Sequence, residues 1–265
     1  MASIKLDKKR IPKHIGIIMD GNRRWAVRRG LTAMEGHEAG VKALIEIVEH
    51  CLELGVETLT IYALSTENWR KRARKEVEGL FNLLLRAVEE KKEEYKEKGV
   101  KVAVIGDFQA FPRKVVRAIR EMLAVVKTHE RLKVNVALNY GGRDEILRAV
   151  KKIVEQDIPT KEINEEMFGK FLYTNGEPDP DLMIRTGGQE RLSNFLLWQL
   201  SYSELYFTDT LWPDFSPRKI DQAIAEYQRR ERRFGGGKFE VYKSKISSAS
   251  RKQPEEVGQA SKKQK

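Results

Sequence analysis

Short apolar runs alternate with longer amphipathic segments along most of this chain. The runs with the length and composition of buried strands are 14–20, 58–64, 101–107, 133–140, 181–187 and 204–209. The segments that repeat apolar residues every three or four positions, as helices do, are 36–54, 75–98, 112–128, 143–156, 164–172 and 217–234. Alternating strands and helices predict a mostly parallel sheet covered by helices on both faces. We therefore expect an α/β fold with a six-stranded, mostly parallel sheet flanked by helices.

The regular alternation is confined to the middle of the chain. No internal linker interrupts it, so we expect one domain over 11–235, preceded by a short extension over 1–10. Residues 236–265 are rich in Lys, Ser, Gln and Gly and show no sustained apolar period, which predicts a mostly disordered tail. Most charged tails are simply solvated. The alternative is that this basic tail makes a peripheral contact with anionic lipid or binds nucleic acid.

Composition excludes several classes of protein. The formal net charge is +11, but 40% of the residues are hydrophobic, which excludes a wholly disordered chain. No apolar run approaches the roughly 20 residues of a membrane span, and the N-terminus lacks the apolar stretch of a secretory signal. The one cysteine, Cys51, cannot form an internal disulfide. The motifs GxxxxGK[ST], HExxH and GxSxG are absent. We therefore expect a cytoplasmic protein.

Ligands of parallel sheets bind beyond the carboxyl ends of the strands, and the first strand is followed by an unusual segment. Asp20 comes directly after that strand, and Gly21 lets backbone amides approach a ligand closely. The arginines that follow supply donors suited to a multiply charged oxyanion. An acid, a glycine and several arginines in this order suit a diphosphate bound with a divalent cation. The alternative is that Asp20 caps a helix whose basic face is solvated.

A second group of charged residues is expected at the same edge of the sheet. Segments 65–74 (STENWRKRAR) and 185–195 (RTGGQERLSNF) each carry several basic residues at or after the end of a strand. Cations crowded together repel one another unless an anion neutralises them. We expect Glu204, which begins the sixth strand, to lie near this cluster as a second acid, as in metal-assisted diphosphate chemistry. Ser65 is equally well explained as a helix cap.

Several long motifs occur in order over residues 11–236. They are HIGIIMDGNRRWA, the GH pair at 36–37, YALSTENW, NYGGRDEI, DLMIRTGGQERLSNFLLWQLSYSELYFTD, LWPDF and RRERRFGG. Together they resemble the cis-prenyltransferases, the undecaprenyl diphosphate synthase family. The resemblance implies an enzyme that adds isopentenyl diphosphate repeatedly to an allylic diphosphate, forming cis double bonds, and makes a long polyprenyl diphosphate as precursor of a glycosyl carrier lipid. It also implies Mg²⁺ as cofactor, a homodimer and a hydrophobic product tunnel.

The resemblance assigns roles to individual residues. Asp20 matches the essential magnesium-binding aspartate, and Glu204 matches an acid that assists metal binding across the dimer interface. The residues that match the allylic diphosphate site are Gly21, Asn22, Arg23, Arg24, Trp25 and His37. Those that match a further substrate-contacting stretch are Ser65, Thr66, Glu67, Asn68, Trp69 and Lys71. Those that match the isopentenyl diphosphate site are Arg185, Arg191, Leu192 and Ser193.

Asn68 matches a residue to which the family's proton-removal step is often assigned. A neutral amide has almost no proton affinity at pH 7, so we do not expect a true base at this position. We expect Asn68 to orient the substrate or a proton relay, with a diphosphate oxygen as the acceptor.

The chain departs from the bacterial pattern at three positions. Ala33 stands where an arginine is usual, and we expect Arg28 or Arg29 to supply the missing charge. Lys71 stands at the arginine of the usual NWxRP, which keeps the charge but loses the bidentate fork. Glu190 replaces a frequent histidine and would be a stronger magnesium ligand. The NRR loop resembles archaeal and eukaryotic members, so we predict an archaeal source and geranylgeranyl diphosphate, ahead of farnesyl diphosphate, as primer.

The helix predicted over 75–98 has an unusually broad apolar face. Its members are Val77, Leu80, Phe81, Leu84, Leu85 and Val88. A helix that faces both the sheet and a hydrocarbon tunnel would have such a face, with Ala63 and Leu132 as further tunnel-wall candidates. For any single residue, ordinary core packing is the competing explanation.

Two other functions compete with an active homodimeric enzyme. A nucleic-acid-binding protein would use the basic charge, but acids beside the basic loops would repel phosphate backbones. A non-catalytic subunit of a heteromeric prenyltransferase usually lacks the first aspartate motif, whereas Asp20 is present here. We therefore expect an active enzyme that binds no nucleic acid.

Overall fold

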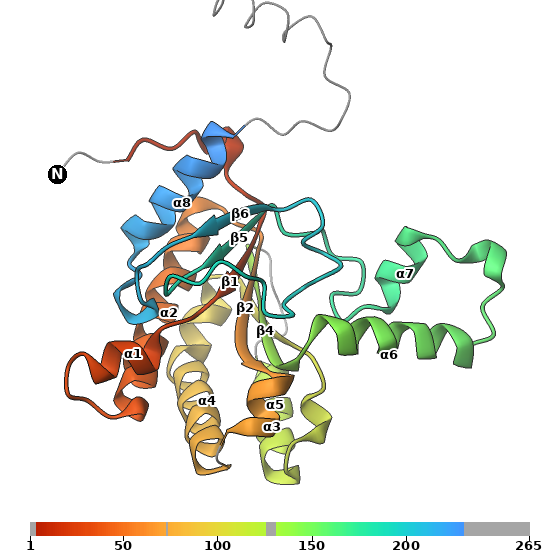
Figure 1. The fold of residues 1–265 in the computed structure, drawn as a ribbon, viewed down its shortest axis with the longest axis horizontal. Coiled ribbons are helices and arrows are strands. Elements are labelled where there is room, and N and C mark those ends of the chain that lie inside the picture. Colours follow the sequence, from red (N-terminus) through yellow and green to blue (C-terminus); the bar gives the residue numbers. More distant parts are fainter. Residues whose placement is uncertain (1–3, 73, 126–130, 231–265) are drawn as a thin grey trace, which may run out of the picture. The chain divides into compact units, whose positions relative to one another are not determined.

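The computed structural model describes residues 4–72, 74–125 and 131–230, and within them six strands form one parallel sheet in the order β3-β4-β2-β1-β5-β6 (Figure 1). The strands are β1 (His14–Ile18), β2 (Thr58–Ser65), β3 (Val100–Ile105), β4 (Leu132–Tyr140), β5 (Leu182–Arg185) and β6 (Glu204–Phe207). Every neighbouring pair is parallel. This confirms the expected α/β fold and makes the sheet entirely, rather than mostly, parallel.

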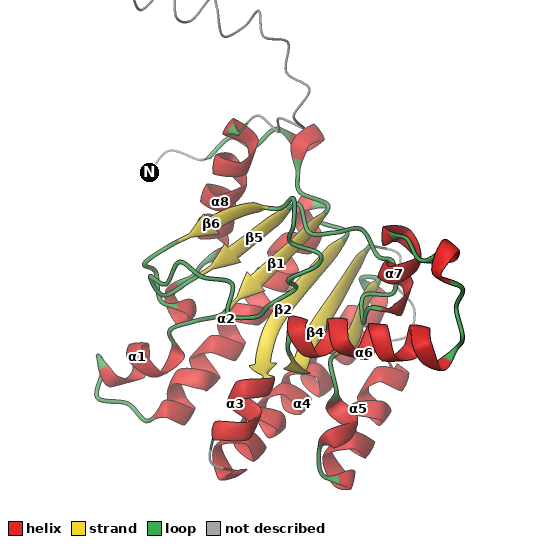
Figure 2. Ribbon diagram, turned by 45° about the vertical axis from the view of Figure 1, so that its right-hand side comes forward, coloured by secondary structure: helices red, strands yellow, loops and turns green. Residues whose placement is uncertain are grey.

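Helices flank the sheet in the order that the sequence predicts (Figure 2). They are α1 (Asn22–Val27), α2 (Ala33–Leu54), α3 (Thr66–Lys71), α4 (Arg74–Glu97), α5 (Arg113–Val125), α6 (Gly142–Glu155), α7 (Glu165–Phe171) and α8 (Pro217–Arg229). The same described ranges contain four short 3-10 turns: η1 (Lys8–Arg10), η2 (Phe108–Ala110), η3 (Thr160–Glu162) and η4 (Trp212–Asp214). The short helices α1 and α3 lie where the sequence analysis expected strand-end loops.

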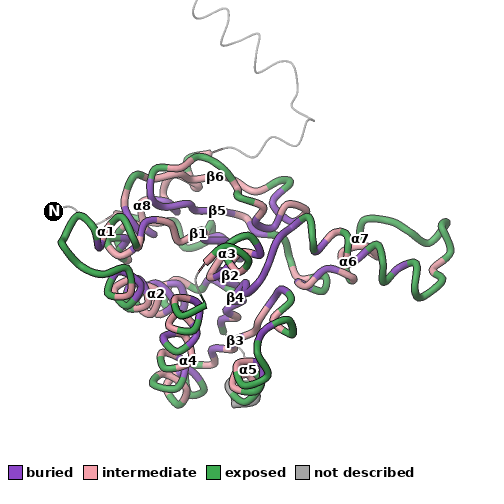
Figure 3. The backbone as a smooth tube through the Cα atoms, turned by 60° about the horizontal axis from the view of Figure 1, so that its bottom comes forward, coloured by how far each residue is buried: buried purple, intermediate pink, exposed green. Residues whose placement is uncertain are grey.

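Side chains alternate between the two faces of the sheet, and each face has its own apolar cluster. Ile15 and Ile17 of β1 are fully buried in a large cluster with residues of α2, α4, α5 and α8. Ile18, on the other face, belongs to a second cluster with Phe195 and Leu196 from the segment between β5 and β6. Figure 3 shows the buried strands between helices whose outer sides are exposed. Because both faces of a parallel sheet are covered, its strands carry continuous apolar runs.

Local signals explain where the long helix α2 begins and ends. The Thr32 hydroxyl accepts a hydrogen bond from the amide of Glu35, whose carboxylate accepts one from the amide of Thr32. This reciprocal capping box satisfies two donors that the helix leaves free. Gly55 ends the helix in the left-handed conformation (φ 81°) that glycine adopts without a steric penalty.

The predicted extension over 1–10 is described from residue 4. Its Asp7 and Arg10 carbonyls accept hydrogen bonds from the Gln228 amide of α8, so this segment packs on the last helix. The predicted basic tail over 236–265 lies outside the described residues. No helix within the described ranges has the length and apolar character needed to cross a membrane.

Candidate functional site

The order of the strands reverses at β1, which lies between β2 and β5. In register, Ile18 at the end of β1 lies beside Tyr62 of β2 and Arg185 of β5. Asp20 therefore follows β1 at the point where the carboxyl ends of three neighbouring strands meet. Crevices at such switch points are the usual ligand sites of open parallel sheets.

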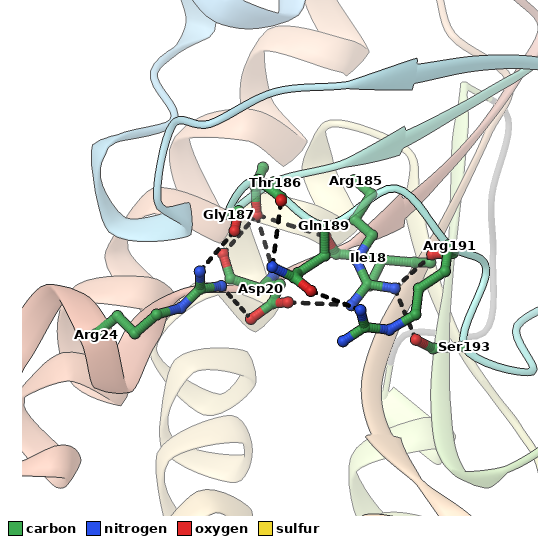
Figure 4. A network of polar contacts seen from close by, with 10 residues as sticks. Ile18, Asp20, Arg24, Arg185, Thr186, Gly187, Gln189, Arg191 and Ser193 are labelled. Carbon is green, nitrogen blue, oxygen red and sulfur yellow. Dashed lines mark hydrogen bonds and ion pairs between the residues drawn. The ribbon is translucent and has the colours of Figure 1, made fainter.

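Asp20 is held between two arginines at this point (Figure 4). Its Oδ2 accepts from Arg185 Nη2 at 3.1 Å, and its Oδ1 accepts from Arg24 Nη2 at 2.9 Å. Arg24 Nη1 also donates to the Gly187 carbonyl at 2.6 Å. The Arg185 residue is only 4% exposed, so Asp20 is the counter-ion that makes burial of this guanidinium tolerable.

Arg185 also organises the loop that follows β5. Its Nη1 donates to the Ser193 hydroxyl at 2.6 Å and to the Arg191 carbonyl. Arg191 in turn donates to the side chain of Gln189 at 2.5 Å and remains exposed. One buried cation thus fixes the position of an exposed cation and of a hydroxyl at the rim of the site.

The backbone of Asp20 is clamped as firmly as its side chain. Its N–H donates to the Thr186 hydroxyl at 2.9 Å, and that hydroxyl donates to the Asp20 carbonyl at 2.7 Å. The same carbonyl accepts from the amide of Trp212 at 3.1 Å. Gly21 then turns into α1 with φ 121°, where an added Cβ would lie 2.9 Å from Leu211 Cδ2. Glycine is the residue that this close approach permits.

A cavity of about 750 Å³ opens beside Asp20. Its polar lining residues are Asp20, Asn22, His37, Ser65, Glu67, Asn68, Arg72, Arg185, Arg191, Ser193 and Asn194. Its aliphatic and aromatic wall includes Val41, Leu44, Ile61, Ala63, Leu64, Leu80, Phe81, Leu84 and Leu138. A charged end joined to an apolar wall suits a ligand that carries an anionic head group on a hydrocarbon chain.

His37 lies on the α2 side of this cavity and is almost fully buried. Its Nε2 lies 3.5 Å from Glu76 Oε1, and Arg72 Nη1 lies 3.4 Å from the same oxygen. Burial, and then the charge of Arg72, lowers the pKa of His37 below its ordinary value of 6.5. The imidazole is therefore neutral at pH 7, and the positive charge here belongs to the arginines.

The structure brings many of the predicted residues to the cavity. Those that line it are Asp20, Asn22, His37, Ser65, Glu67, Asn68, Arg185, Arg191 and Ser193. The Ser65 hydroxyl accepts from the Asn68 amide at 3.0 Å and so caps α3, while both residues line the cavity. The two explanations of Ser65, cap and ligand contact, are thus compatible. Of the tunnel-wall candidates, Ala63 lines the cavity, whereas Leu132 is a core residue.

Three predicted positions lie elsewhere because α3 is a helix rather than a loop. Thr66 and Trp69 line a second, smaller cavity of about 230 Å³ on the other side of α3. Lys71 is exposed and is not among the lining residues of either cavity, so its substrate-binding role stays a prediction. Arg72, the next residue, lines the main cavity instead. Leu192 packs against the second apolar cluster of the sheet.

The α1 segment divides its contacts between the site and the outer surface. Trp25 Nε1 donates to Asp214 at 2.7 Å, and the Arg29 guanidinium lies 4.2 Å from the centre of the Trp25 ring while it also pairs with Asp214. Arg29 therefore does not replace the arginine missing at Ala33. Arg23 pairs with Glu76, which His37 also contacts. That Arg28 supplies the missing charge stays a prediction.

Glu204 does not reach Asp20 within one chain. It begins β6 and lies beside Leu182, the first residue of β5, at the amino ends of the strands. Asp20 follows their carboxyl ends, so the expectation that both acids share a cluster was wrong for a single chain. Glu190 is exposed and is not a lining residue of the cavity. The metal-binding roles of both glutamates stay predictions.

Two polar residues at the site were missed by sequence reasoning. Glu76 gathers His37, Arg23 and Arg72, and its four-residue spacing from Arg72 is a signal that could have revealed the pair. Asn194 donates to Glu67 at 3.1 Å and accepts from the Arg143 amide at 2.9 Å, so it joins α3 and α6 to the segment after β5. Nothing in the local sequence marks Asn194.

A magnesium ion fits the residues present, but only together with a substrate. In the part of the chain that the structure describes, no three acidic, histidine or cysteine side chains come together as a complete metal site. Asp20 nevertheless lines the cavity, and its side chain is 31% exposed. Mg²⁺ commonly binds through one or two carboxylates plus substrate phosphates and keeps several waters. Asp20 would hold such an ion against a diphosphate.

The fold and cavity define a parallel α/β protein whose cavity suits an anionic head group carried on a hydrocarbon chain. The family model described as "Putative undecaprenyl diphosphate synthase" matches residues 18–235. An isoprenyl transferase of Clostridium perfringens is 48% identical over 88% of this chain and 93% of that protein. One of Aquifex aeolicus is 48% identical over 85% of this chain and 96% of that protein.

Two solved structures lead to the same family as these sequence comparisons. A lavandulyl diphosphate synthase from Lavandula x intermedia, in complex with dimethylallyl diphosphate, superposes with a TM-score of 0.81, is 36% identical and covers 86% of this chain and 99% of its own. A probable undecaprenyl diphosphate synthase from Campylobacter jejuni has a TM-score of 0.71 and 38% identity, covering 84% of this chain and 98% of its own. This chain therefore belongs to the undecaprenyl diphosphate synthase family of cis-prenyltransferases, and it is an isoprenyl transferase.

Proposed function

We propose that this enzyme condenses isopentenyl diphosphate repeatedly with an allylic diphosphate to give a polyprenyl diphosphate of about undecaprenyl length, the precursor of a glycosyl carrier lipid. The observation that carries the proposal is the single cavity in which Asp20 and three arginines adjoin a wall of Leu, Ile and Phe side chains. Such a cavity can bind the charged diphosphate and the hydrocarbon chain of one substrate.

The two diphosphates would bind to different groups of residues. Asn22 and His37 line the end nearest α1, where Arg24 donates to Asp20 and where the allylic diphosphate would lie. Arg185, Arg191 and Ser193 would hold isopentenyl diphosphate. Magnesium held by Asp20 would stabilise the negative charge that develops on the leaving diphosphate. The arginines do the same from fixed positions, because they are oriented before substrate arrives.

Asn68 would orient the reacting chain rather than remove its proton. Its backbone N–H donates to the hydroxyl of Ser65, the N-cap of α3, and Asn68 also lines the cavity. An amide is too weak a base to take a proton at neutral pH, so a diphosphate oxygen is the acceptor that we propose. An Asn68→Asp variant with near-normal turnover would argue against a strict positional role.

The primer that we propose is geranylgeranyl diphosphate, with farnesyl diphosphate next. Support for an allylic diphosphate as such comes from the similar lavandulyl diphosphate synthase structure, which contains dimethylallyl diphosphate. The two curated relatives named above are bacterial, so they lend no support to the predicted archaeal source. Competition between the two primers in one reaction tests the preference directly.

Product length would depend on the apolar wall, which we propose to be the start of the product tunnel. Ala63 is the smallest side chain of that wall, belongs to β2 and packs against the apolar cluster to which α4 contributes. An Ala63→Leu variant should release shorter chains without losing the first condensation, because the added methyl groups fill space that the growing hydrocarbon needs. Unchanged product lengths would place the tunnel elsewhere.

We propose that the enzyme is a homodimer in which Glu204 assists the partner's site. Three apolar residues lie on one stripe of α6, which extends to the side of the sheet in Figure 1: Leu147, Val150 and Val154 are 60%, 45% and 69% exposed. Exposed apolar stripes of this kind mark interaction surfaces. A Leu147→Glu, Val154→Glu double variant should be monomeric by light scattering; the exposed Arg117→Glu change in α5 serves as its control.

The central test is to incubate the protein with magnesium, labelled isopentenyl diphosphate and each primer separately, and to resolve the product lengths. A long cis product that disappears in Asp20→Ala would support the proposal. A folded, dimeric protein that makes no product from any primer would favour the non-catalytic subunit of a heteromeric enzyme.

A further inference from the structure

Glu76 is a carboxylate surrounded by basic groups beside the proposed allylic diphosphate site. It lies in the first turn of α4, and three side chains from α1, α2 and the end of α3 converge on it. Arg23 contacts Oε2, while His37 and Arg72 lie 3.5 and 3.4 Å from Oε1. Two of the three, His37 and Arg72, line the cavity, whereas Glu76 stands behind them.

The contacts around Glu76 are incomplete. Glu76 Oε1 and His37 Nε2 are both buried without a hydrogen-bond partner in the described residues, because their separation is too long for a good hydrogen bond. Buried polar atoms normally find close partners, so Glu76 Oε1 is held to Arg72 by charge rather than by a well-formed hydrogen bond. Burial, and then the nearby charge of Arg23, lowers the pKa of Arg72, whereas the Glu76 charge raises it.

We infer that Glu76 is an internal counter-anion that competes with the diphosphate head group for Arg23, Arg72 and His37. Two guanidinium charges without a counter-ion would hold a diphosphate tightly. With Glu76 in place, a diphosphate must displace the carboxylate from these cations or share them with it, and this limits the affinity for the diphosphate. This inference rests on the proposed function, in which pyrophosphate leaves the allylic site after each condensation and the elongated diphosphate, formed where isopentenyl diphosphate binds, then moves into that site.

The alternative is that Glu76 merely positions the arginines or favours the start of α4, where an acid interacts well with the helix dipole. The two explanations predict opposite changes in diphosphate affinity when the charge of Glu76 is removed. If Glu76 positions its neighbours, removing its charge weakens diphosphate binding. If it competes with the ligand, removing its charge strengthens binding.

The experiment is calorimetric titration with inorganic pyrophosphate in EDTA, which excludes the metal at Asp20, on the full-length wild type, Glu76→Gln and Glu78→Gln. Glu78 is an exposed acid two residues along α4 and serves as the matched control. We expect Glu76→Gln to bind pyrophosphate about fivefold to tenfold more tightly, as expected for removal of a half-buried competing charge. Its affinity should also fall more steeply with salt, because more free cations are neutralised on binding.

Equal or weaker binding by Glu76→Gln overturns the inference, as does a wild type that binds no pyrophosphate. If Glu76→Gln does not fold, Glu76→Asp decides. The shorter side chain withdraws the carboxylate from the cations, so this variant should also bind pyrophosphate more tightly than the wild type does. A failure of the proposed function looks different: a wild type that makes no prenyl product, while Glu76→Gln still binds pyrophosphate more tightly, overturns that function and leaves the inference standing.

Discussion

Asp20 and Arg185 form an ion pair of 3.1 Å in which the carboxylate is partly exposed and the guanidinium almost fully buried. The pair therefore serves two purposes. Arg185 needs the charge of Asp20 to be tolerated in the interior, and Asp20 needs Arg185 to be oriented toward the cavity.

Replacing Asp20 with Asn should reduce both activity and stability. Turnover should fall by about 100-fold or more, since preorganised charge is lost from the site. The free energy of unfolding should fall by about 1–3 kcal/mol, because the buried Arg185 loses its counter-ion. Product assays and urea denaturation measure the two effects. Asp157→Asn, in an exposed turn, should change neither. A variant that retained wild-type turnover would contradict the assigned role of Asp20.

Arg72 and Lys71 should differ in their effect on substrate binding. Arg72→Ala removes a cation from the cavity wall and should raise the KM for the allylic diphosphate about tenfold, whereas Lys71→Ala should leave it within about twofold. Steady-state kinetics with the primer varied at saturating isopentenyl diphosphate makes the comparison. A larger effect at Lys71 would restore the assignment based on the NWxRP pattern.

Gly187 should tolerate no side chain. Its φ is 84°, and an added Cβ would lie 2.5 Å from Arg24 Nη2 and 2.9 Å from the Asp20 carbonyl. Gly187→Ala should therefore cost about 1–3 kcal/mol of stability and lower activity by displacing Arg24. Gly169→Ala is the matched control, because that position is helical and a Cβ there meets nothing within 4 Å. It should stabilise the protein by about 0.5–1 kcal/mol.

His14 should make the protein less stable in mild acid. The ring is buried at the amino ends of the strands, where its two nitrogens lie 2.7 Å from the Thr60 hydroxyl and from the Pro178 carbonyl. Burial lowers its pKa below 6.5, although the Pro178 carbonyl and the charges of Glu177 and Asp181 act in the opposite direction. Lys133 lowers it further.

The folded state therefore binds the His14 proton less readily than the unfolded state does. Stability should be fully present above about pH 6.5 and should fall as the pH drops below it, by up to about 1.4 kcal/mol per pH unit. Urea denaturation between pH 7.5 and 5 should show a shallower dependence in His14→Gln than in the wild type. Identical slopes would mean that other groups, such as His37, whose pKa is also lowered, account for the whole effect.

The sequence predicted the parts of the site that depend on strand ends. Asp20, Ser65 and Arg185 lie at or just beyond apolar runs, and the geometry of a parallel sheet brings such positions together. The same rule, applied to Glu204, should have placed that residue at the opposite edge, because it begins a strand instead of ending one.

The sequence does not show which of Lys71 and Arg72 faces the cavity, because this depends on the backbone conformation at the end of α3. Lys71 is the last residue of α3, and Arg72 leaves the helix with an extended backbone (φ −77°, ψ 149°). Two adjacent basic residues at a helix end point in different directions, and no residue type there indicates which one turns inward. The convergence of Arg23 and Arg72 on Glu76 likewise joins elements distant in the sequence.

The hydrogen bonds that clamp the backbone of Asp20 connect three distant parts of the chain: the end of β1, Thr186 after β5, and Trp212 before α8. The amide proton of Trp212, which is bonded to Asp20 and buried, should consequently exchange with solvent only when these segments separate. Local fraying of a surface loop would leave the Asp20 carboxylate in position. Loss of activity on heating should therefore coincide with cooperative unfolding of the sheet, without an earlier inactivation step.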